Sequence, residues 1–489
     1  MQLPLSPDPR QSFIVLEGSR RTFAEVNHSA SAACAVILRH TPLEPGDRVA
    51  ILMETPAPFI HSLLALMRMR VVSAPLNTRL TASELAWQIN NVDCRLVICE
   101  AETRALAGQL GVDLLEMGAL DQAEPASQFG DFGMMNLDDD FAIIHTSGTG
   151  GRPKAAILTY GNVYQSAVAS ALKLDTRRSE QWLCVLPLYH VGGLSIVFRS
   201  LNYGTAIEVV APGPFDVDAV NRILSEHPIT LVSLVPTMLQ RLLDAKTKPW
   251  NPHLRLILLG GAAPSPELVA RCIAEGLPIA TTYGLTEASS QVATAMPDLV
   301  YRKPGTVGKP LMVTQVRIRG ENGEETAAGV PGEILVKGGT VMRAYYGEPA
   351  ATAAALRDGW LHTGDIGYQD EDGDLFILQR REDLIVSGGE NIYPAEVEAA
   401  LRRHPAVAEA VVIGLPDAEW GQRVAAALQL APGAIASAEE IESHARAHLA
   451  AYKIPRRFAF VDALPRTASG KIQRRKLRQL FDDTIPRRP

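Results

Sequence analysis

The feature that most constrains the fold of this chain is an alternation of short apolar runs with helical stretches between Arg48 and Tyr283. Short continuous apolar runs predict buried strands, and the spacing of apolar residues between most of them predicts amphipathic helices such as residues 59–69. Thr81 with Glu84 predicts a capping box at the start of another helix. Because strand–helix units repeat, we predict an α/β fold with parallel sheets that helices cover. The strand candidates are residues 49–53, 71–77, 95–99, 183–186, 206–210, 229–235, 255–259 and 278–283.

The pattern changes near Lys309, where a β-rich subdomain of about residues 309–380 is predicted. Residues 313–320 and 332–338 predict antiparallel strands with tight turns, and residues 368–378 predict a hairpin with its turn at Asp372-Gly373. A charged and then glycine-rich junction follows. We therefore expect a large N-terminal domain, residues 1–380, and a small α+β C-terminal domain, residues 381–489. Residues 121–140 carry acidic residues and glycines and show no helical or strand periodicity, which predicts a surface connection.

The composition is typical of a globular protein and excludes several functions. The formal net charge of -7 argues against a nucleic-acid surface. The N-terminal residues lack the apolar core of a signal peptide, and no apolar run is long enough to insert into a membrane. The cysteines are scattered and lack CxxC spacing, which argues against structural zinc and indicates a reducing compartment, so a cytoplasmic location is expected. The cysteines are Cys34, Cys94, Cys99, Cys184 and Cys272.

The segment TSGTGGRPK, residues 146–154, predicts a loop that wraps a polyphosphate. It follows the apolar run of residues 141–144, and its glycines allow positive φ, which turns backbone N–H groups inward. Its hydroxyl groups and its lysine add donors and a positive charge. It is not a Walker A loop, because GxxxxGK[ST] does not fit; a flexible surface turn is the alternative. The candidate phosphate-binding residues are Thr146, Ser147, Gly148, Thr149, Gly150, Gly151 and Lys154.

Two later motifs end in acidic residues. In YGLTE, residues 283–287, Glu287 is a candidate Mg²⁺ ligand near phosphates, and an acid that stabilises a helix start is the alternative. In HTGD, residues 362–365, Asp365 is suited to accept hydrogen bonds from ribose hydroxyls, and an Asx turn is the alternative.

Two further motifs lie towards the C-terminus. SGGEN, residues 387–391, predicts a backbone that passes close to another group, with a plain domain-junction loop as the alternative. PRTASGKIQRRKLR, residues 465–478, places Lys471 after a flexible turn and before a basic helix. A solvated basic tail is the alternative there, and we favour it for Arg474, Arg475 and Lys476.

The order of the motifs is more specific than any one of them. TSGTGGRPK, PLYH, GGAAP, YGLTE, HTGD, RREDLIVSGGENIYPAEVE and PRTASGK together resemble the ATP-dependent acyl-CoA synthetases of the adenylate-forming superfamily. The resemblance covers nearly the whole chain. It implies an AMP-forming acid–thiol ligase that uses ATP, Mg²⁺ and coenzyme A, forms an acyl-adenylate, and then rotates a mobile C-terminal domain. The partners it implies are small molecules, and a homo-oligomer is compatible with the sequence.

The resemblance also implies roles for individual residues. Residues 146–151 and Lys154 match the phosphate loop, and Lys471 matches the catalytic lysine of adenylate formation. Thr286 and Glu287 match the α-phosphate and Mg²⁺ positions, and Glu382 matches the hinge. The residues that match the adenine pocket are Gly261, Ala262, Ala263, Thr282, Tyr283 and Gly284. The residues that match the ribose site are Asp365 and Arg380, and those that match the thiol channel are Ser387, Gly388, Gly389 and Glu390.

The sequence departs from the family pattern at two positions. Gly150 stands where the family usually has Thr or Ser, so a hydroxyl group is lost and Ser147, Thr149 and the backbone are expected to bind that phosphate. Gln379 replaces the glycine before the ribose arginine, which we do not expect to matter.

Residues 187–204, PLYHVGGLSIVFRSLNYG, are the most informative about the acid. His190 matches the family histidine that borders the acyl carboxylate. Val191, Ser195 and Arg199 follow at four-residue spacing and are expected to share one helix face. An arginine on that face suits a substrate with a second carboxylate, and the alternative is that Arg199 caps a surface helix. Additional polar contacts are expected from Ser289, Ser290 and Gln291.

The sequence argues against three other functions. A ligase for another aryl acid or for medium- or long-chain fatty acids would need an apolar pocket. Arg199 and Gln291 are polar and argue against such a pocket. An amino-acid adenylation module would carry an Asp within residues 232–239, and none is present. A non-catalytic homologue would be expected to lose Lys471 or Glu287, and both remain.

Overall fold

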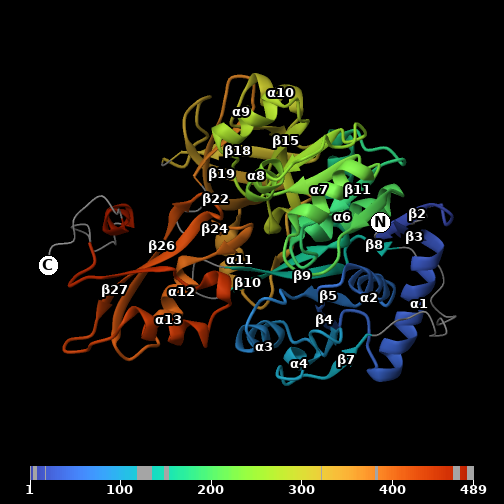
Figure 1. Ribbon diagram of the computed structural model, residues 1–489. Coiled ribbons are helices and arrows are strands. Elements are labelled where there is room, and N and C mark those ends of the chain that lie inside the picture. Colours follow the sequence, from blue (N-terminus) through green and yellow to red (C-terminus); the bar gives the residue numbers. More distant parts are fainter. Residues whose placement is uncertain are drawn as a thin grey trace. The chain divides into compact units, whose positions relative to one another are not determined.

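The computed structural model describes residues 2–3, 8–16, 18–117, 135–147, 153–320, 322–379, 384–465 and 474–481. The chain forms two compact units (Figure 1). The first unit comprises residues 1–78, 86–145 and 155–379, and the second comprises residues 79–85, 146–154 and 380–489. Strands and helices alternate along much of the chain, which confirms the predicted α/β class.

The first sheet has seven strands in the order β20-β10-β9-β5-β4-β6-β7. Its centre is parallel, and strands such as β4 are buried almost throughout, as expected where helices cover a sheet. The strands are β4 (Arg48–Leu52), β5 (Val72–Pro75), β6 (Leu96–Cys99), β7 (Leu114–Glu116), β9 (Asp140–Ser147), β10 (Pro153–Thr159) and β20 (Ala344–Tyr345). The helices in this part of the chain are α1 (Phe23–His40), α2 (Pro56–Arg68), α3 (Ala82–Asn91) and α4 (Arg104–Ala107).

The predicted capping box before α3 is confirmed. The backbone N–H of Glu84 donates to Oγ1 of Thr81, and the N–H of Thr81 donates back to Oε2 of Glu84 at 2.8 Å. The predicted surface connection of residues 121–140 is partly strand, because β8 (Met135–Asn136) pairs with β1 (Gln2–Leu3) and β9 starts at Asp140. The remainder up to residue 134 lies outside the described residues.

The second sheet has fourteen strands and joins a parallel half to an antiparallel half. Its order is β18-β19-β22-β23-β17-β16-β15-β14-β13-β11-β12-β2-β3, with β21 beside β22. The parallel half contains β11 (Gln181–Cys184), β12 (Ala206–Val209), β13 (Leu231–Leu234), β14 (Leu256–Leu259) and β15 (Ile279–Leu285), with β2 (Ser12–Leu16) and antiparallel β3 (Ser19–Thr22) at its edge. The helices are α5 (Tyr160–Leu174), α6 (Val191–Tyr203), α7 (Val217–Glu226), α8 (Pro236–Asp244) and α9 (Pro266–Ala274).

The antiparallel half matches the predicted β-rich character of residues after Lys309. The hairpin around Asp372 and Gly373 is confirmed, and residues 327–330 form a tight turn between β18 and β19, where the N–H of Val330 donates to the carbonyl of Ala327. Its strands are β16 (Ser290–Ala295), β17 (Thr306–Pro310), β18 (Thr314–Arg319), β19 (Gly332–Gly338), β21 (Leu356–Arg357), β22 (Trp360–Gln369) and β23 (Leu375–Gln379). Its helices are the single 3₁₀ turn η2 (Thr286–Ala288), α10 (Pro297–Arg302) and α11 (Pro349–Ala355).

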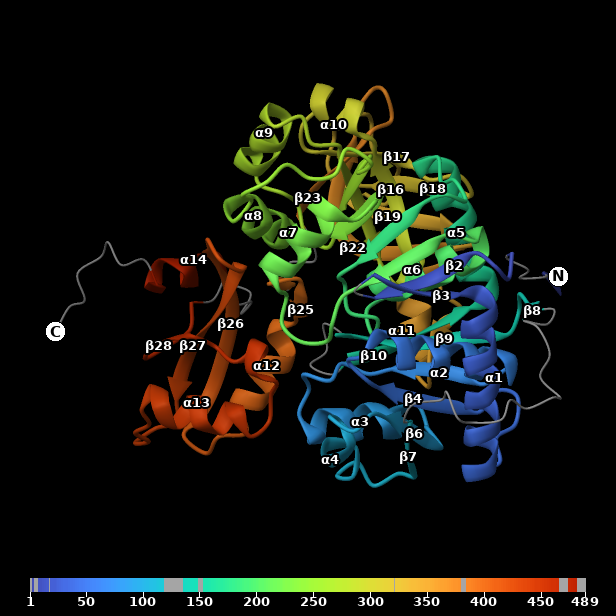
Figure 2. The same cartoon turned by 45° about the vertical axis from the view of Figure 1, so that its right-hand side comes forward.

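The second unit is built on a five-stranded sheet of order β25-β24-β27-β26, with β28 parallel to β27 (Figure 2). Its helix α13 (Ala438–Arg446) begins with a capping box at Ser437. The strands are β24 (Ile385–Ser387), β25 (Glu390–Ile392), β26 (Val407–Asp417), β27 (Gly421–Leu430) and β28 (Arg457–Phe460). The helices are α12 (Pro394–Leu401), α13 (Ala438–Arg446), the 3₁₀ turns η3 (Ala451–Lys453) and η4 (Arg478–Phe481), and α14 (Arg474–Leu477).

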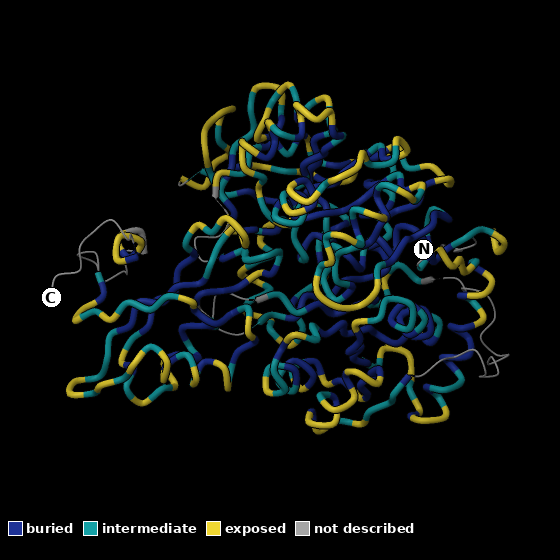
Figure 3. The backbone as a smooth tube through the Cα atoms, in the orientation of Figure 1, coloured by how far each residue is buried: buried dark blue, intermediate teal, exposed yellow. Residues whose placement is uncertain are grey.

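Burial follows the sheets in both units (Figure 3). The largest fully buried side chain is Trp182 on β11, and the parallel strands around it carry mostly Leu, Ile and Val. Among the described residues no helix is both long and apolar enough to cross a membrane.

Candidate active site

The carboxylate of Asp365 is held inside the first unit by Tyr283. The phenolic hydroxyl of Tyr283, on β15, donates a 2.6 Å hydrogen bond to Oδ2 of Asp365, on β22. The side chains are 1% and 7% exposed. The backbone N–H of Asp365 donates to Oγ1 of Thr363 at 3.0 Å. Because an ionised carboxylate is costly to bury without donors, the bond from Tyr283 stabilises one orientation of the Asp365 carboxylate. A residue predicted for adenine and a residue predicted for ribose therefore contact each other directly.

Glu287 lies on the η2 turn between β15 and β16 and is 5% exposed. Its Oε1 accepts a 2.8 Å hydrogen bond from the hydroxyl of Tyr345. The turn that presents it is tight, because Ser289 and Ser290 adopt φ of 53° and 91°. Gly284 is required here, since a Cβ at that position would lie 1.7 Å from the carbonyl oxygen of Ser290.

The predicted adenine residues come from two neighbouring parallel strands. Leu259, the last residue of β14, pairs with Thr281 on β15, so the turn at residues 260–263 lies next to Thr282 and Tyr283. Gly261 adopts φ of 80° in this turn. The hydroxyl of Thr282 donates to the carbonyl of Ala293 at 2.9 Å, so in this structure it stabilises the sheet.

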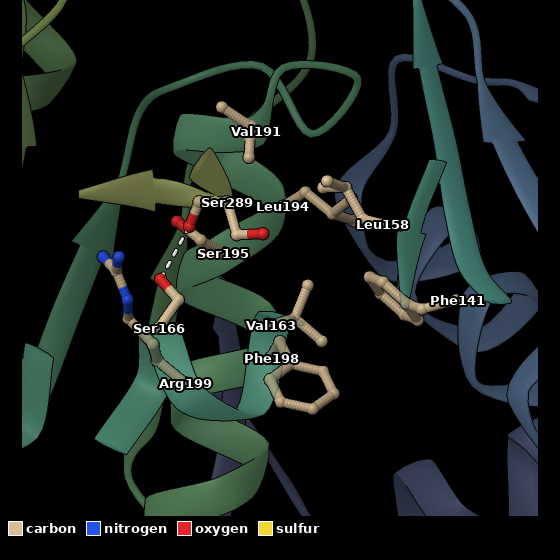
Figure 4. Close-up of a pocket in the computed structure, with 10 residues that line it drawn as sticks. All are labelled: Phe141, Leu158, Val163, Ser166, Val191, Leu194, Ser195, Phe198, Arg199 and Ser289. Atoms are coloured by element: carbon tan, nitrogen blue, oxygen red, sulfur yellow. Dashed lines mark hydrogen bonds between the residues drawn. The ribbon is translucent and has the colours of Figure 1, made fainter. Parts of the chain in front are cut away.

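The helix face predicted for the acid forms one wall of a pocket. Val191, Ser195 and Arg199 lie on α6 and line the same small pocket, whose interior has room for roughly one water-sized group (Figure 4). Ser166 on α5 and Ser289 contribute the other polar side chains. Besides Val191, the apolar lining residues are Phe141, Leu158, Val163, Leu194 and Phe198.

Arg199 is buried, which rules out the alternative that it caps a surface helix. Its side chain is 2% exposed, and its Nε and Nη2 have no hydrogen-bond partner among the described residues. The guanidinium lies over the ring of Trp182, with Cζ 5.8 Å from the centroid. Burial lowers the pKa of Arg199 to about 10. A buried cation with unsatisfied donors at a pocket wall is suited to bind an anionic group.

The other predicted acid residues do not line this pocket. His190 is the residue before α6 and is partly exposed. Oγ of Ser195 lies 3.5 Å from Oγ of Ser290. Gln291 is buried and donates from Nε2 to Oγ1 of Thr294 at 2.9 Å.

Sequence reasoning missed Ser166 and the apolar lining residues. Ser166 accompanies small and apolar residues along α5, and Phe141 and Leu158 belong to apolar runs on β9 and β10, so each looks like ordinary core. Their shared pocket depends on the packing of α5 against α6, which local periodicity does not show.

In the second unit the motif SGGEN forms a two-residue hairpin turn. Ser387 pairs with Glu390, and Gly388 and Gly389 adopt φ of 59° and 87°. A Cβ on Gly388 would lie 2.6 Å from Cε3 of Trp420, so the predicted close approach of the backbone is confirmed.

Several predicted residues lie outside the described residues: Gly148, Thr149, Gly150, Gly151, Arg380, Glu382 and Lys471. The two residues at the ends of the loop contact each other: Oγ1 of Thr146 donates to the carbonyl of Lys154 at 3.3 Å. His145, which precedes the loop, stacks edge-on against Trp87 with ring centroids 6.1 Å apart.

Comparison with known proteins decides the family. Residues 6–346 match the AMP-binding enzyme family, and residues 396–471 match the AMP-binding enzyme C-terminal domain. The chain belongs to the AMP-binding enzyme family.

Relatives of this AMP-binding enzyme match it along nearly their whole length. A 2-succinylbenzoate–CoA ligase from Bacillus cereus is 40% identical over 484 residues, which cover 98% of this chain and 97% of the relative. One from Geobacillus sp. is 41% identical over 465 residues, covering 94% and 93%.

Solved structures agree with the fold. A double mutant of o-succinylbenzoate CoA synthetase from Bacillus subtilis, bound with its product analogue OSB-NCoA, is 36% identical, has a TM-score of 0.91 and covers 96% of each chain. The same synthetase in complex with ATP and magnesium ion has a TM-score of 0.73 at 36% identity, covering 96% of this chain and 97% of that one. The α/β architecture with a large N-terminal and a smaller C-terminal domain is that of an AMP-binding enzyme.

Glu287 fits a magnesium ligand in this AMP-binding enzyme. Mg²⁺ takes hard oxygen donors and is held by one or two carboxylates together with substrate phosphates. Glu287 is a buried carboxylate whose orientation the Tyr345 hydroxyl stabilises. Thr286 precedes it on the same turn and offers a hydroxyl oxygen.

A second group of carboxylates is not a comparable site. Asp370, Asp372 and Asp374 lie close together in the β22–β23 hairpin. The ammonium group of Lys303 donates to all three, at 2.8 Å to Asp370 and 2.7 Å to Asp374. These contacts raise the pKa of Lys303, so the cluster already has a cation.

Proposed function

We propose that this AMP-binding enzyme joins 2-succinylbenzoate (o-succinylbenzoate) to coenzyme A with ATP, through an acyl-adenylate, and releases AMP and diphosphate. The product, o-succinylbenzoyl-CoA, belongs to menaquinone or phylloquinone biosynthesis. The full-length similarity to 2-succinylbenzoate–CoA ligases supports this reaction. The observation that carries the choice of acid is Arg199, a buried cation with unsatisfied donors at the wall of a small pocket. An acid with one carboxylate to activate and a second to bind matches it.

The first half-reaction needs positive charge at the α-phosphate. A carboxylate that attacks ATP approaches an anion, and negative charge develops on the phosphoryl oxygens. Groups that stabilise this charge more in the transition state than in the ground state lower the barrier. We assign this role to Lys471 and to the loop of residues 146–151 with Lys154. Thr286 is assigned to the α-phosphate, and Mg²⁺, which Glu287 would hold, would neutralise phosphate charge when bound.

The nucleoside is assigned to the residues around Tyr283. Asp365, oriented by Tyr283, accepts hydrogen bonds from ribose hydroxyls, and Arg380 binds beside it. The adenine base lies by the turn of residues 261–263 and the strand of residues 282–284. Because Asp365 keeps its orientation before ATP binds, less ordering is needed on binding.

The acid is assigned to α6 and its neighbours. His190 borders the carboxylate that reacts, and Arg199 with Ser195 binds the second carboxylate. Val191, Ser290 and Gln291 complete the surroundings. Since the pocket has room only for a small group, we assign to it the terminal carboxyl group of the acid and not its ring.

The second half-reaction is assigned to the C-terminal domain, residues 381–489. Rotation about Glu382 withdraws Lys471 and brings up the hairpin of residues 387–390, which lines the channel for the thiol. In the described residues the five cysteines are buried and unpaired, which supports a reducing compartment such as the cytoplasm.

The test is diphosphate release and thioester formation with ATP and Mg²⁺, with and without coenzyme A. The acids are o-succinylbenzoate, benzoate, 4-coumarate, octanoate and an amino-acid mixture. We expect strong release only with o-succinylbenzoate, and its CoA thioester only when coenzyme A is present. A preference for octanoate or 4-coumarate would overturn the assigned acid and leave the AMP-forming mechanism intact. No release with any acid would overturn both.

A further inference from the structure

We infer that Tyr345 is a positioning residue. It holds the Glu287 carboxylate in a fixed position relative to the strand that follows the glycine-rich phosphate loop. The inference rests on the proposed function, because it assigns Tyr345 a role in the binding of Mg·ATP at Glu287. Tyr345 belongs to none of the motifs that the sequence marks, and it lies 58 residues beyond Glu287.

The first observation is the contact itself. The phenolic hydroxyl of Tyr345 donates to Oε1 of Glu287 at 2.8 Å, and the two side chains are 3% and 5% exposed. A hydrogen bond to a buried carboxylate is stronger than one to a neutral group and also restricts the orientation of that carboxylate.

The second observation is where the backbone of Tyr345 is fixed. Tyr345 lies on β20, which pairs antiparallel with β10, opposite Ala156. On either side of it, the N–H of Arg343 donates to the carbonyl of Ile157 at 3.0 Å, and the N–H of Tyr346 donates to Ala155 at 2.8 Å. Strand β10 starts at Pro153, directly after the glycine-rich loop. Tyr345 is therefore in register with the strand that follows the phosphate loop.

The third observation is that the segment before Tyr345 also holds the turn that carries Glu287. The N–H of Met342 donates to the carbonyl of Glu287 at 2.8 Å, and Oγ of Ser289 donates to the carbonyl of Thr340 at 2.8 Å. Asn162, in the first turn of α5, donates to the carbonyls of Gly339 and Val341, both at 2.8 Å. We call residues 338–346 the connecting segment.

These contacts link two sheets. Glu287 follows β15 in the fourteen-stranded sheet, whereas β10 belongs to the seven-stranded sheet. The connecting segment is hydrogen-bonded to both, and the Tyr345 hydroxyl is the side-chain contact that reaches the carboxylate. Without it the backbone contacts remain but the carboxylate loses a donor, so we expect a less ordered Glu287 on an intact fold.

The experiment compares two adjacent tyrosines. Tyr345→Phe removes the hydroxyl and keeps the ring. The control is Tyr346→Phe, because the Tyr346 hydroxyl also donates to a carboxylate, Oδ2 of Asp93, at 2.9 Å on the surface. Titration calorimetry without acid gives the Kd for Mg·ATP, diphosphate release gives kcat and KM, and thermal unfolding gives Tm.

We expect Tyr345→Phe to weaken Mg·ATP binding about tenfold and to lower kcat for diphosphate release about tenfold. Its KM for the acid should stay within about twofold, and its Tm should fall by only a few degrees below that of Tyr346→Phe, because one hydrogen bond to a buried carboxylate is lost on an otherwise intact fold. Tyr346→Phe should bind Mg·ATP and turn over like the wild type. Binding of Mg·ATP to Tyr345→Phe that is as tight as in the wild type would overturn the inference.

A double variant separates positioning from general destabilisation. If Tyr345 acts through Glu287, Tyr345→Phe should have little further effect on Mg·ATP binding in a Glu287→Gln background. An equal loss in both backgrounds would contradict the role. The Mg·ATP titration contains no acid, so a wild type that binds Mg·ATP normally but rejects o-succinylbenzoate would refute the proposed acid and leave the role of Tyr345 to be decided by the variants.

Discussion

Tyr283 donates a 2.6 Å hydrogen bond to Asp365, although the two residues are 82 positions apart in the chain. Tyr283 lies on β15, in the parallel half of the fourteen-stranded sheet, and Asp365 lies on β22, in the antiparallel half. The bond therefore joins the two parts of the sheet at the residues assigned to the nucleoside.

Tyr283→Phe is expected to weaken ATP binding. The variant keeps the buried ring but removes a donor from a buried carboxylate, so Asp365 loses orientation for the ribose hydroxyls. We expect the KM for ATP, measured by diphosphate release at saturating acid, to rise about tenfold. Tyr368→Phe is the control, because Tyr368 lies on β22 with Asp365 and stacks on Phe376 with ring centroids 4.8 Å apart. An unchanged KM for Tyr283→Phe would contradict the assignment of Asp365.

Arg199→Met is expected to lose selectivity while gaining stability. Without the guanidinium, kcat/KM for o-succinylbenzoate should fall about 100-fold, while the low activity on benzoate should change little. Because Nε and Nη2 of Arg199 have no partner among the described residues, replacing this buried cation should raise the free energy of unfolding by about 1–2 kcal/mol.

The control for Arg199 is Arg317→Met. Arg317 is an exposed arginine whose Cζ lies 4.6 Å from the ring centroid of Trp360, so the same substitution also removes an arginine from a tryptophan ring. Kinetics on both acids and urea unfolding compare the two variants. A normal kcat/KM for o-succinylbenzoate in Arg199→Met would refute the assigned carboxylate contact.

His145 is expected to make the protein sensitive to acid. Both ring nitrogens are buried without a partner among the described residues, and burial lowers the pKa of His145 from 6.5 to about 3. Between these values the unfolded chain binds a proton that the folded chain does not. The free energy of unfolding therefore falls as the pH drops below 6.5, by up to about 1.4 kcal/mol per pH unit.

His145→Phe should remove this dependence. The variant keeps an aromatic ring against Trp87, and between pH 7 and pH 5 it should lose about 2 kcal/mol less stability than the wild type. Urea unfolding at the two pH values measures the difference. His253→Gln, at an exposed histidine, should behave like the wild type. An equal loss in His145→Phe and the wild type would show that His145 titrates normally.

Gly388→Ala is expected to affect thioester formation selectively. Its Cβ would lie 2.6 Å from the Trp420 ring, and its φ of 59° adds strain, so the turn of the hairpin must move. If this hairpin lines the thiol channel, transfer of the acyl group to coenzyme A should slow at least about tenfold while diphosphate release from ATP stays normal.

Gly433→Ala is the matched control for this substitution. Gly433 has a φ of 77° in the same unit, and an added Cβ meets nothing within 4 Å among the described residues. The Gly433→Ala variant therefore has the backbone strain of Gly388→Ala but no contact with Trp420. Single-turnover measurement of each half-reaction distinguishes the variants, and equal thioester rates in both would contradict the assigned channel.

The amino-acid sequence by itself determined the features that depend on neighbours along the chain. The strands around residues 49–53 and 255–259, the capping box at Thr81 and the turn at Asp372 are confirmed because periodicity, capping and turn chemistry act over a few residues. The order of the motifs identified the family, and the spacing of Val191, Ser195 and Arg199 placed them on one helix face.

Only the tertiary structure decided which polar groups are buried and what they contact. It placed Arg199 inside the first unit, brought Ser166 to the same pocket, and joined Tyr283 to Asp365 and Tyr345 to Glu287. The partners are 82 and 58 residues apart, so no local pattern pairs them. Their contacts arise from sheet order and strand register, which depend on how distant elements pack together, and a buried charge is stabilised only by the partners that this packing supplies.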